Sequence, residues 1–451
     1  MDATTLQALA AACGGVLLCG DPGATVANIS KDTRTIRPGD VYWALQGENF
    51  DGHHFVSAAA ASGASAAVVS RDLREMPSGL AVIRVGDTQE ALHRLASWHR
   101  DRLRGKVVCL TGSNGKTSTK DFTAAIAGVR FRVNKTEGNF NNHIGLPLTI
   151  LSASAADEVA VWEIGMNRPG EIGELARLAR PDIGIITNIG VAHIEFLGSR
   201  EAIAREKGML GEALRNDGAL ILPAEDGFSA HLASRTPARV VLVGGGESLR
   251  AERLRPSTHG LDFELVCGGE RVAAQISVAG EHMVRNALLA VAAGRELGLS
   301  LRECASGLAS AKLSRGRLAC LDVRGVTVLD DTYNANPDSM EAALHALRGL
   351  PGGGRRFAVL GRMGELGDYA NEGYRRVGRA AAGTMDVLIA VGPETAPMAD
   401  EAVASGAREV RRAADTAEAA TLLRELSRPG DAVVIKGSRT ARMERVLEDF
   451  A

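Results

Sequence analysis

The stretch from Lys106 to Lys120 combines residue types suited to binding the phosphates of a nucleotide. Val107–Leu110 is apolar and β-branched, as in a buried strand, and a turn with two glycines follows at 111–115. Lys116 and Thr117 then open a predicted helix, whose first amide groups can bind an anion. The lysine adds positive charge, and the threonine hydroxyl is placed to ligate Mg²⁺. This segment therefore predicts a phosphate-binding loop.

The loop departs from the strict pattern at one position. That pattern has a glycine five residues before Gly115, where this chain has Leu110. An ordinary glycine-rich turn between a strand and a helix is therefore an alternative interpretation. The predicted strand before the turn and the predicted helix after it favour nucleotide binding.

Two further polar residues follow predicted strands. Glu163 ends a strand that begins within 157–162, and His193 lies in the loop beyond the strand Ile183–Ile186. In a parallel sheet, ligands bind beyond the carboxyl ends of the strands, where the phosphate loop also lies. Either residue alone could be structural. Together with the loop they predict ligands of a Mg²⁺ ion on the nucleotide phosphates.

Lysine is rare in this chain, since only eight of the 52 basic residues are lysines. Arginine cannot serve as a nucleophilic amine or as a compact point charge, so each lysine is slightly more informative than usual. Lys207 lies on a predicted amphipathic helix, Glu201–Leu214. A lysine facing solvent is the alternative interpretation there.

Composition narrows the class of protein. A chain of 451 residues suggests about three domains, and no run approaches the length of a membrane span. A net charge of −2 and 4% aromatic residues argue against a nucleic-acid partner. No Lys or Arg precedes Lys31, so we expect no secretory signal and a cytoplasmic protein. The six cysteines form no C-x-x-C pair, which is typical of reduced thiols.

Short strands alternate with helices along the whole chain, which predicts an α/β protein. Residues 1–102 carry strands at 41–45 and 66–70 and helices at 55–61 and 88–100. The segment 46–55 is predicted as a loop, whose aromatic and histidine side chains could hold a planar, charged ligand. A solvated turn is the alternative.

The remaining elements place polar residues at strand ends. Residues 261–279 predict a hairpin that turns at the glycines 268 and 269, and a helix at 282–297 carries His282 and Asn286 one turn apart. From 315 onward, strands are predicted at 326–329, 357–360, 387–391 and 432–435. Their ends carry Asp330, Asp331, Asn334, Asn336, Lys436, Ser438 and Arg439. The G-x-G-x-x-G pattern is absent from this doubly wound segment, so a dinucleotide domain is not expected.

Taken together, these motifs resemble the Mur ligase family, the ATP-dependent amide ligases of peptidoglycan precursor synthesis. The resemblance covers nearly the whole chain. It rests on TGSNGKT (111–117), TEGNFNNHIGLPLTIL (136–151), EIGMNRPGEI (163–172), TNIGVAHIEFLGS (187–199), IAREKGML (203–210), DDTYNANPDSM (330–340) and VIKGSRTARMERV (434–446). The segments GNFNN, NANPDSM and KGSR are the most specific.

The resemblance implies three α/β domains. They are a UDP-substrate-binding domain at 1–102, a central ATP-binding domain with a P-loop ATPase-type parallel sheet at 103–314, and a C-terminal Rossmann-like domain at 315–451.

It also implies roles for individual residues. ATP would be bound by Thr111, Gly112, Ser113, Asn114, Gly115, Lys116, Thr117, Ser118, His282, Asn286, Arg317 and Asp331. The UDP substrate would be bound by Ser30, Asp32, Thr33, Arg34, Gln46, Gly47, Asn139, Asn141, Asn142 and Asn167. The expected Mg²⁺ ligands are Thr117, Glu163, His193 and Lys207, with Lys207 carbamylated. Lys116, Glu163, His193, Lys207 and Arg317 would be catalytic.

Three positions depart from the family pattern. Met283 stands where an asparagine is usual, so adenine recognition is expected to differ at this position. Arg362 replaces an aspartate, and Tyr374 replaces a histidine. Because both lie in the expected acceptor region, the sequence does not identify the residues that bind the acceptor.

Within the family, the motifs are most similar to members that join D-alanyl-D-alanine to UDP-N-acetylmuramoyl-tripeptide. The expected mechanism is phosphorylation of a substrate carboxylate by ATP, followed by attack of the dipeptide amine on the acyl phosphate. A monomer is expected. Three alternatives stay open: a ligase that adds the third amino acid, a folylpolyglutamate synthase, and a regulatory P-loop ATPase that forms no amide.

Overall fold

The computed structural model describes residues 1–47, 50–246, 248–257 and 260–451. By internal contacts the chain divides into two compact units. The first comprises Met1–Cys109, Phe131–Met166 and Gly173–Pro181, and the second comprises Leu110–Arg130, Asn167–Ile172 and Asp182–Ala451. The boundary passes inside strand β10 (Lys106–Thr111), so the units interleave along the sequence. The three domain ranges expected from the sequence stay a prediction.

The first unit is built around a five-stranded sheet in the order β2-β9-β8-β5-β4. These strands are β2 (Val16–Cys19), β4 (Ile29–Ser30), β5 (Val41–Trp43), β8 (Ala66–Val69) and β9 (Ala81–Arg84). The pairs β4–β5, β5–β8 and β8–β9 are parallel, and β2 pairs antiparallel with β9 at one edge. Helices α1 (Leu6–Cys13), α2 (Val56–Ala61) and α3 (Thr88–Arg100) accompany the sheet, and β1 (Thr4–Thr5) pairs with β3 (Thr25–Val26).

The segment 46–55 is more ordered than the sequence predicted. Strands β6 (Gln46–Gly47) and β7 (Phe50–Asp51) pair antiparallel, and a 3-10 turn follows at Gly52–Phe55. The prediction of a loop was therefore wrong for these residues, while 48–49 lie outside the described residues. The exposed rings of Phe50 and Phe55 stack with their centroids 5.1 Å apart. The hairpin thus presents aromatic surface to solvent.

The remaining elements of the first unit carry one of the expected site residues. Strand β11 (Val133–Lys135) pairs in parallel with β12 (Val159–Glu163), which ends on the predicted residue Glu163. Helix α5 (Gly145–Ser152) packs against α3. Helix α6 (Glu171–Ala179) crosses the boundary between the units.

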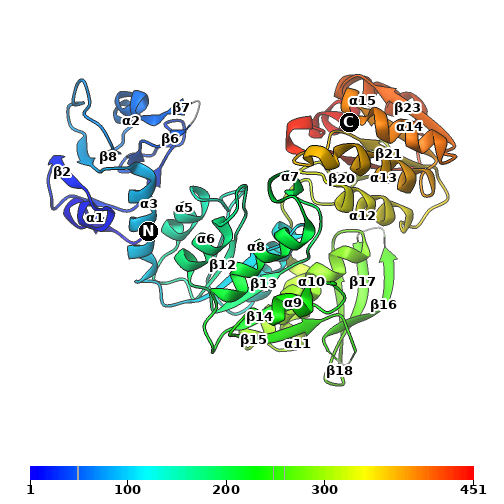
Figure 1. Cartoon of the computed structure of the whole chain (residues 1–451), viewed down its shortest axis with the longest axis horizontal. Helices are drawn as coiled ribbons and strands as arrows, with labels where there is room; N and C mark the ends of the chain where they lie inside the picture. Colours follow the sequence, from blue (N-terminus) through cyan, green and yellow to red (C-terminus); the bar gives the residue numbers. More distant parts are fainter. Residues whose placement is uncertain (48–49, 247, 258–259) are drawn as a thin grey trace. The chain divides into compact units, whose positions relative to one another are not determined.

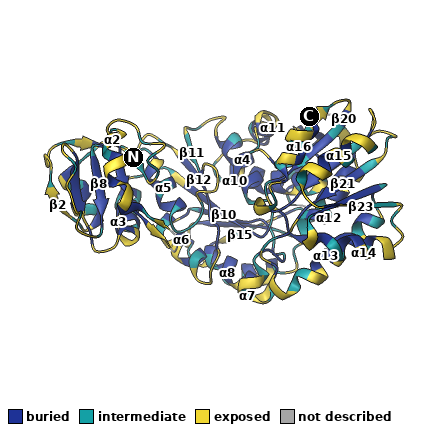
Figure 2. Ribbon diagram, turned by 90° about the horizontal axis from the view of Figure 1, so that it is seen from above, coloured by how far each residue is buried: buried dark blue, intermediate teal, exposed yellow. Residues whose placement is uncertain are grey.

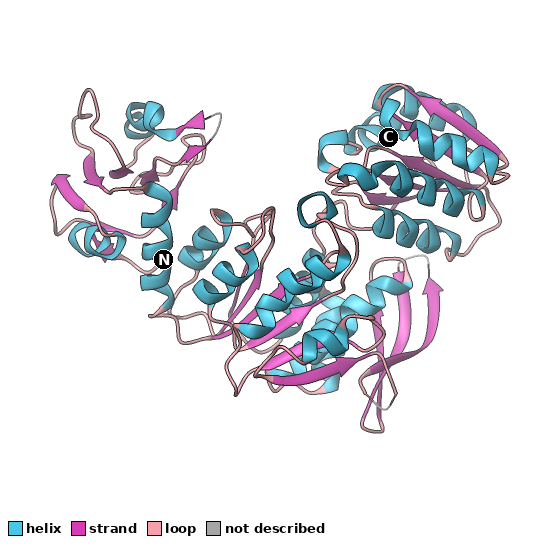
Figure 3. Cartoon of the chain, viewed as in Figure 1, coloured by secondary structure: helices cyan, strands magenta, loops and turns pink. Residues whose placement is uncertain are grey.

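The second unit begins with a parallel sheet segment and its helices. Strands β13 (Ile183–Ile186), β14 (Ala219–Pro223) and β15 (Arg239–Val243) pair in parallel. The helices are α4 (Lys116–Ala127), α7 (Ile194–Leu197), α8 (Arg200–Glu212), α9 (Ser229–Ala233), α10 (Glu281–Glu296) and α11 (Leu301–Ser310) (Figure 3). The predicted hairpin is confirmed as β17 (Gly260–Cys267) and β18 (Glu270–Ile276), and β16 (Arg250–Ser257) extends it to three antiparallel strands.

The C-terminal part of the second unit contains a six-stranded sheet in the order β19-β20-β24-β21-β22-β23. Its strands are β19 (Ala319–Val323), β20 (Val326–Asp331), β21 (Arg356–Leu360), β22 (Val387–Val391), β23 (Glu409–Ala413) and β24 (Ala432–Lys436). All pairs are parallel except β19–β20. Helices α12 (Pro337–Arg348), α13 (Ala370–Ala382) and α14 (Ala396–Ala404) cover one face, and α15 (Thr416–Leu426) and α16 (Glu444–Phe450) cover the other (Figures 1 and 2). The doubly wound prediction is confirmed.

Two expectations from composition can be compared with this fold. All six cysteines are free thiols, as the absence of a C-x-x-C pair predicted. Among the residues with described positions, none of the helices combines the length and apolar character that crossing a membrane requires.

Candidate active site

The predicted strand at 107–110 and the predicted helix opening at Lys116 are confirmed as β10 and α4. Gly115 precedes α4 with φ of 79°, a left-handed conformation that a side chain disfavours. A Cβ atom at this position would lie 2.4 Å from Oδ1 of Asn286 on α10. Gly115 is therefore required both by its backbone conformation and by the close approach of Asn286.

The loop is held from behind by the turn that follows β13. Asn188 accepts hydrogen bonds from the amides of Ser113, at 3.0 Å to its carbonyl, and of Asn114, at 2.9 Å to its side-chain oxygen. The hydroxyl of Thr187 donates to the carbonyl of Asn114 at 2.5 Å. These bonds fix the shape of the loop. Thr187 and Asn188 were not predicted as functional residues, although both lie directly after a predicted strand, in the segment TNIG (187–190).

A pocket of about 600 Å³ opens beside this loop, a size typical of small-molecule sites. Several predicted ATP-binding residues line it: Asn114, Gly115, Ser118, His282, Asn286, Arg317 and Asp331. The other residues of that set belong to the strand, the turn or the start of α4: Thr111, Gly112, Ser113, Lys116 and Thr117. The structure thus brings residues from α4, α10 and β20 to one cavity.

One part of the pocket is apolar and suits a planar base. Val243, Leu254 and Leu289 line it together with Met283, which is buried. The amide of Asn286 faces the sulfur of Met283 at 3.6 Å, so the residue that departs from the family pattern offers a soft acceptor to Asn286. Burial lowers the pKa of His282 to about 4, so its imidazole is neutral near pH 7.

Two cationic side chains lie beside the phosphate loop. The ammonium of Lys116 donates to the carbonyl of Gly112 at 2.8 Å. The guanidinium of Arg317 donates to the hydroxyl of Thr117 at 3.1 Å and lies 4.1 Å from the ring centroid of Tyr333. Both cations can therefore stabilise charge on a phosphate bound at the start of α4.

A buried ion pair joins the ends of two neighbouring strands. Lys436, at the end of β24, places its ammonium 2.6 Å from Asp331 at the end of β20 and 2.8 Å from the carbonyl of Asn334. Both members of the pair line the pocket. Burial lowers the pKa of Lys436. The rule that polar residues gather at strand ends singled out Lys436, but gave it no role.

Lys207 is the most informative of the predicted residues. It lies on α8 with only 1% of its surface exposed, so the alternative of a solvent-facing lysine is wrong. Burial lowers the pKa of Lys207 well below its usual range, and the positive charge of Lys116 lowers it further. The neighbouring carboxylate of Glu206 accepts from the amides of Gly170 and Ile172, at 2.8 and 3.1 Å. Because burial and the charge of Lys116 both disfavour the ammonium, the Lys207 amine is shifted toward its neutral, nucleophilic form.

His193 has an unusual backbone for its residue type. Its φ of 66° lies in the left-handed region, a strain of order 1 kcal/mol that is concentrated at functional sites. Its Nδ1 lies 2.6 Å from Oε2 of Glu365, and burial lowers the pKa of the imidazole. A carboxylate on one ring nitrogen leaves the other for a ligand. Glu365 was not assigned from the sequence, although it lies three residues after Arg362, one of the positions that depart from the family pattern.

The residues expected to bind Mg²⁺ supply mainly oxygen ligands, which a hard cation prefers. Glu163 is buried and accepts from the side-chain amide of Asn141 at 2.8 Å in the first unit. Thr117, His193 and Lys207 belong to the second unit. Over 1–47, 50–246, 248–257 and 260–451, no three His, Cys, Asp or Glu residues cluster as metal ligands. The expected set contains only two residues of these types, so the hydroxyl of Thr117 and an oxygen-bearing Lys207 would have to complete it.

The residues expected to bind the UDP substrate fall mostly in the first unit. Asp32 forms an ion pair with Arg34, with Nη2 at 2.6 Å, on the surface of that unit. The ammonium of Lys31 lies 5.5 Å from the ring centroid of Phe140, which brings the segment 30–34 close to 139–142. Asn167 belongs to the second unit. The structure thus assembles two of the predicted segments within one unit.

Comparison with known proteins covers the whole chain. Residues 25–100 match the Mur ligase family, catalytic domain, 110–294 the Mur ligase middle domain, and 316–439 the Mur ligase, glutamate ligase domain. The UDP-N-acetylmuramoyl-tripeptide–D-alanyl-D-alanine ligase of Bacillus subtilis (strain 168) is 35% identical over 428 residues, covering 94% of this chain and 93% of its own.

Two solved structures extend the comparison. MurF from Acinetobacter baumannii superimposes with a TM-score of 0.90 at 32% identity, covering 100% of this chain and 99% of its own. MurF ligase from Thermotoga maritima, in complex with ADP, superimposes with a TM-score of 0.84 at 28% identity. The match covers 94% of this chain and 97% of the Thermotoga maritima chain.

Proposed function

Because this chain belongs to the Mur ligase family, we propose that it joins D-alanyl-D-alanine to UDP-N-acetylmuramoyl-tripeptide at the expense of ATP. The observation that carries the proposal is the pocket beside the phosphate loop, which gathers several of the expected ATP-binding residues from α4, α10 and β20. Relatives with this activity in their names align over nearly the full chain, as do solved structures of MurF. The enzyme would act in peptidoglycan precursor synthesis.

The reaction makes an unreactive carboxylate electrophilic. An oxygen of the tripeptide carboxylate attacks the γ-phosphorus of ATP, the bond to ADP breaks, and an acyl phosphate forms. The amine of D-alanyl-D-alanine then attacks the acyl carbon, loses a proton, and displaces inorganic phosphate. Lys116 and Arg317 stabilise the negative charge on the transferred phosphoryl group from the loop side.

The pocket residues orient the nucleotide for this transfer. The apolar wall around Met283 holds the base, and the paired Asp331 and Lys436 offer a carboxylate to the ribose hydroxyls. Thr117, Glu163, His193 and a carbamylated Lys207 would hold Mg²⁺, which neutralises phosphate charge when bound. Glu365 orients the imidazole of His193 through Nδ1. Positioning of the reacting groups accounts for the rest of the acceleration.

Release of phosphate in the presence of different substrates tests the proposal. We expect release to depend on both UDP-N-acetylmuramoyl-tripeptide and D-alanyl-D-alanine. A regulatory ATPase would release phosphate without an amine acceptor. The ligase that adds the third residue would require the UDP-dipeptide and a single amino acid, and a folylpolyglutamate synthase would require a folate and glutamate. The cytoplasmic location and the monomeric state expected from the sequence stay predictions.

The double variant Asp32→Ala/Arg34→Ala tests the site for the UDP substrate. Both residues lie in the first unit, and an arginine fork suits the oxygens of a pyrophosphate. We expect the Kd for the UDP substrate to rise more than about tenfold, while the Kd for ATP changes less than about twofold. Calorimetric titration of each ligand measures both constants.

The surface ion pair Arg84–Asp72 in the same unit supplies the matched control. The variant Asp72→Ala/Arg84→Ala also removes one exposed pair, and we expect it to leave both constants unchanged. If the Asp32→Ala/Arg34→Ala variant lost the same affinity for ATP as for the UDP substrate, the assignment of residues 30–34 to UDP-substrate binding would be contradicted.

A further inference from the structure

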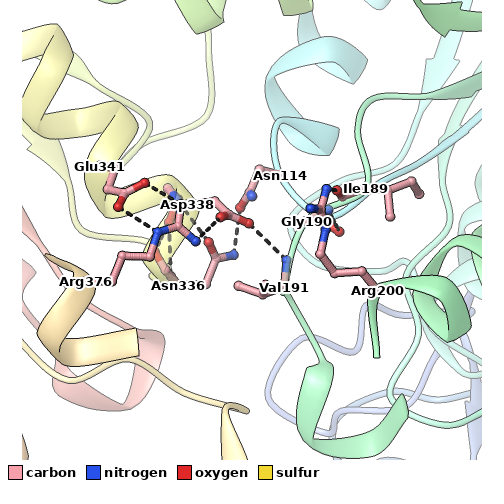
Figure 4. Close-up of polar contacts among 11 residues, drawn as sticks. Asn114, Ile189, Gly190, Val191, Arg200, Asn336, Asp338, Glu341 and Arg376 are labelled. Atoms are coloured by element: carbon pink, nitrogen blue, oxygen red, sulfur yellow. Dashed lines mark hydrogen bonds and ion pairs between the residues drawn. The ribbon is translucent and has the colours of Figure 1, made fainter. Parts of the chain in front are cut away.

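The turn after β13 is held on two sides (Figure 4). The amide of Gly190 donates to the hydroxyl of Ser113 in the phosphate loop at 2.8 Å. The amide of Val191, the next residue, donates to Oδ2 of Asp338 at 2.9 Å, although the two residues lie far apart in the sequence. A Cβ atom at Gly190 would lie 2.2 Å from the same carboxylate oxygen, so the turn and Asp338 are in close contact. This turn leads directly to His193.

Asp338 reaches the turn from the start of α12. The preceding Asn336 caps this helix, accepting from the amide of Ser339 at 3.0 Å, and its side-chain NH₂ donates to Oδ1 of Asn114 at 2.7 Å. The helix is therefore attached to the phosphate loop through Asn336 and to the His193 turn through Asp338. Both contacts involve residues that line the nucleotide pocket or the loop beside it.

The negative charge of Asp338 is unfavourable for binding an anionic nucleotide in the pocket. Asp338 lines a pocket that would receive ATP, and a carboxylate repels phosphate groups at short range. Arg376 on α13 offsets the negative charge of Asp338, because its Nη1 lies 2.9 Å from Oδ1 of that carboxylate. The same guanidinium is fixed by Glu341 of α12, which accepts from Nε at 2.7 Å and also from Nη2 (Figure 4).

We propose that Arg376 is a positioning residue for ATP, which neutralises Asp338 and aims its carboxylate at the amide of Val191. The inference rests on the proposed function only in taking ATP as the ligand of this pocket. Arg376 does not line the pocket and acts through Asp338. Its removal leaves an uncompensated carboxylate beside the nucleotide and frees the turn that carries His193.

Arg379 provides a matched control on the same helix. It lies one turn further along α13 and pairs with Glu372 at 2.5 Å and with Glu401 at 3.3 Å. Arg376→Ala and Arg379→Ala therefore each remove an arginine that bridges two carboxylates. Only the first of the two pairs with Asp338 among the contacts of the described residues.

The experiment measures binding of Mg-ATP to the full chain by calorimetry, together with KM and kcat for ATP. We expect Arg376→Ala to raise the Kd and KM for ATP about tenfold and Arg379→Ala to leave both within about twofold of the parent. Arg376→Lys, which keeps the charge, should recover part of the loss. Thermal unfolding of each variant identifies any general loss of structure.

The double variant Asp338→Asn/Arg376→Ala separates neutralisation of charge from simple packing. Asp338→Asn keeps an acceptor for Val191 and removes the negative charge, so alone it should raise KM for ATP less than about threefold. The double variant should bind ATP better than Arg376→Ala. The proposal would be overturned if the losses of ATP affinity in Asp338→Asn and Arg376→Ala were additive in the double variant. It would also be overturned if Arg376→Ala and Arg379→Ala lost the same ATP affinity. A parent chain that binds ATP but fails to ligate the dipeptide would contradict the proposed function instead.

Discussion

Lys207→Arg should retain less than about one hundredth of the parent ligase activity, although it keeps a positive charge and a similar length. The amine of Lys207 is buried and its pKa is lowered well below the usual range, so the neutral form is accessible. A neutral amine adds CO₂ by forming a nitrogen–carbon bond and releasing one proton, which gives a carbamate with two oxygens. Arginine forms no stable equivalent.

The same charge argument explains why an unmodified ammonium would be unfavourable here. A Lys207 ammonium near Lys116 and near a bound Mg²⁺ would be repelled by both, whereas carbamate oxygens suit that cation. Electron density or native mass measurement at Lys207 provides a readout independent of activity. Adding a short carboxylic acid to Lys207→Ala should restore part of the activity by supplying the missing oxygens.

The exposed Lys312 gives the control for the lysine-to-arginine change. Lys312→Arg should keep full activity, since its side chain faces solvent. An unmodified Lys207 together with a fully active Lys207→Arg variant would end the carbamate hypothesis.

Lys116→Ala should abolish amide formation while leaving the UDP-substrate site intact. The Lys116 ammonium lies 2.8 Å from the carbonyl of Gly112, at the start of α4. In the proposed function it would supply the charge that offsets the β- and γ-phosphates of ATP. Removing a preorganised charge from a phosphoryl-transfer site costs about a thousandfold or more in kcat. The residues expected for UDP binding at 30–34 belong to the other unit, so calorimetry should give an unchanged Kd for the UDP substrate.

A lysine on the surface tests whether loss of any lysine has this effect. Lys106 lies ten residues earlier, at the exposed start of β10, and Lys106→Ala should remain active. If Lys116→Ala lost binding of the UDP substrate together with activity, the variant would be misfolded or the assignment of the two sites would be wrong. A thermal unfolding measurement distinguishes these two explanations.

The sequence predicted the parts of the site that depend on local chemistry. The apolar run before Lys116, the glycine at 115 and the helix-opening residues dictate the strand–turn–helix, because each acts on its own stretch of backbone. The helix Thr88–Arg100 was predicted with its observed bounds. In the structure the side chain of Asp87 caps it by accepting from the amide of Glu90, which is also a local interaction. The glycine pair at 268–269 likewise determined where the hairpin turns.

Other features depend on contacts between distant segments and have no local signal. The helix at 200–212 has a pattern compatible with a solvent-facing lysine, and only the packing of its neighbours buries Lys207. The hairpin within 46–55 was missed because its strands are two residues each, too short for alternation to be recognised.

The contact of Asp338 with Val191, and that of Lys436 with Asp331, join segments more than a hundred residues apart. Sequence alone determined which residue types stand at the strand ends and which motifs accompany them. Tertiary structure decided which of these side chains meet, because the order of strands in the sheet and the packing of helices bring together residues whose local sequences carry no information about each other.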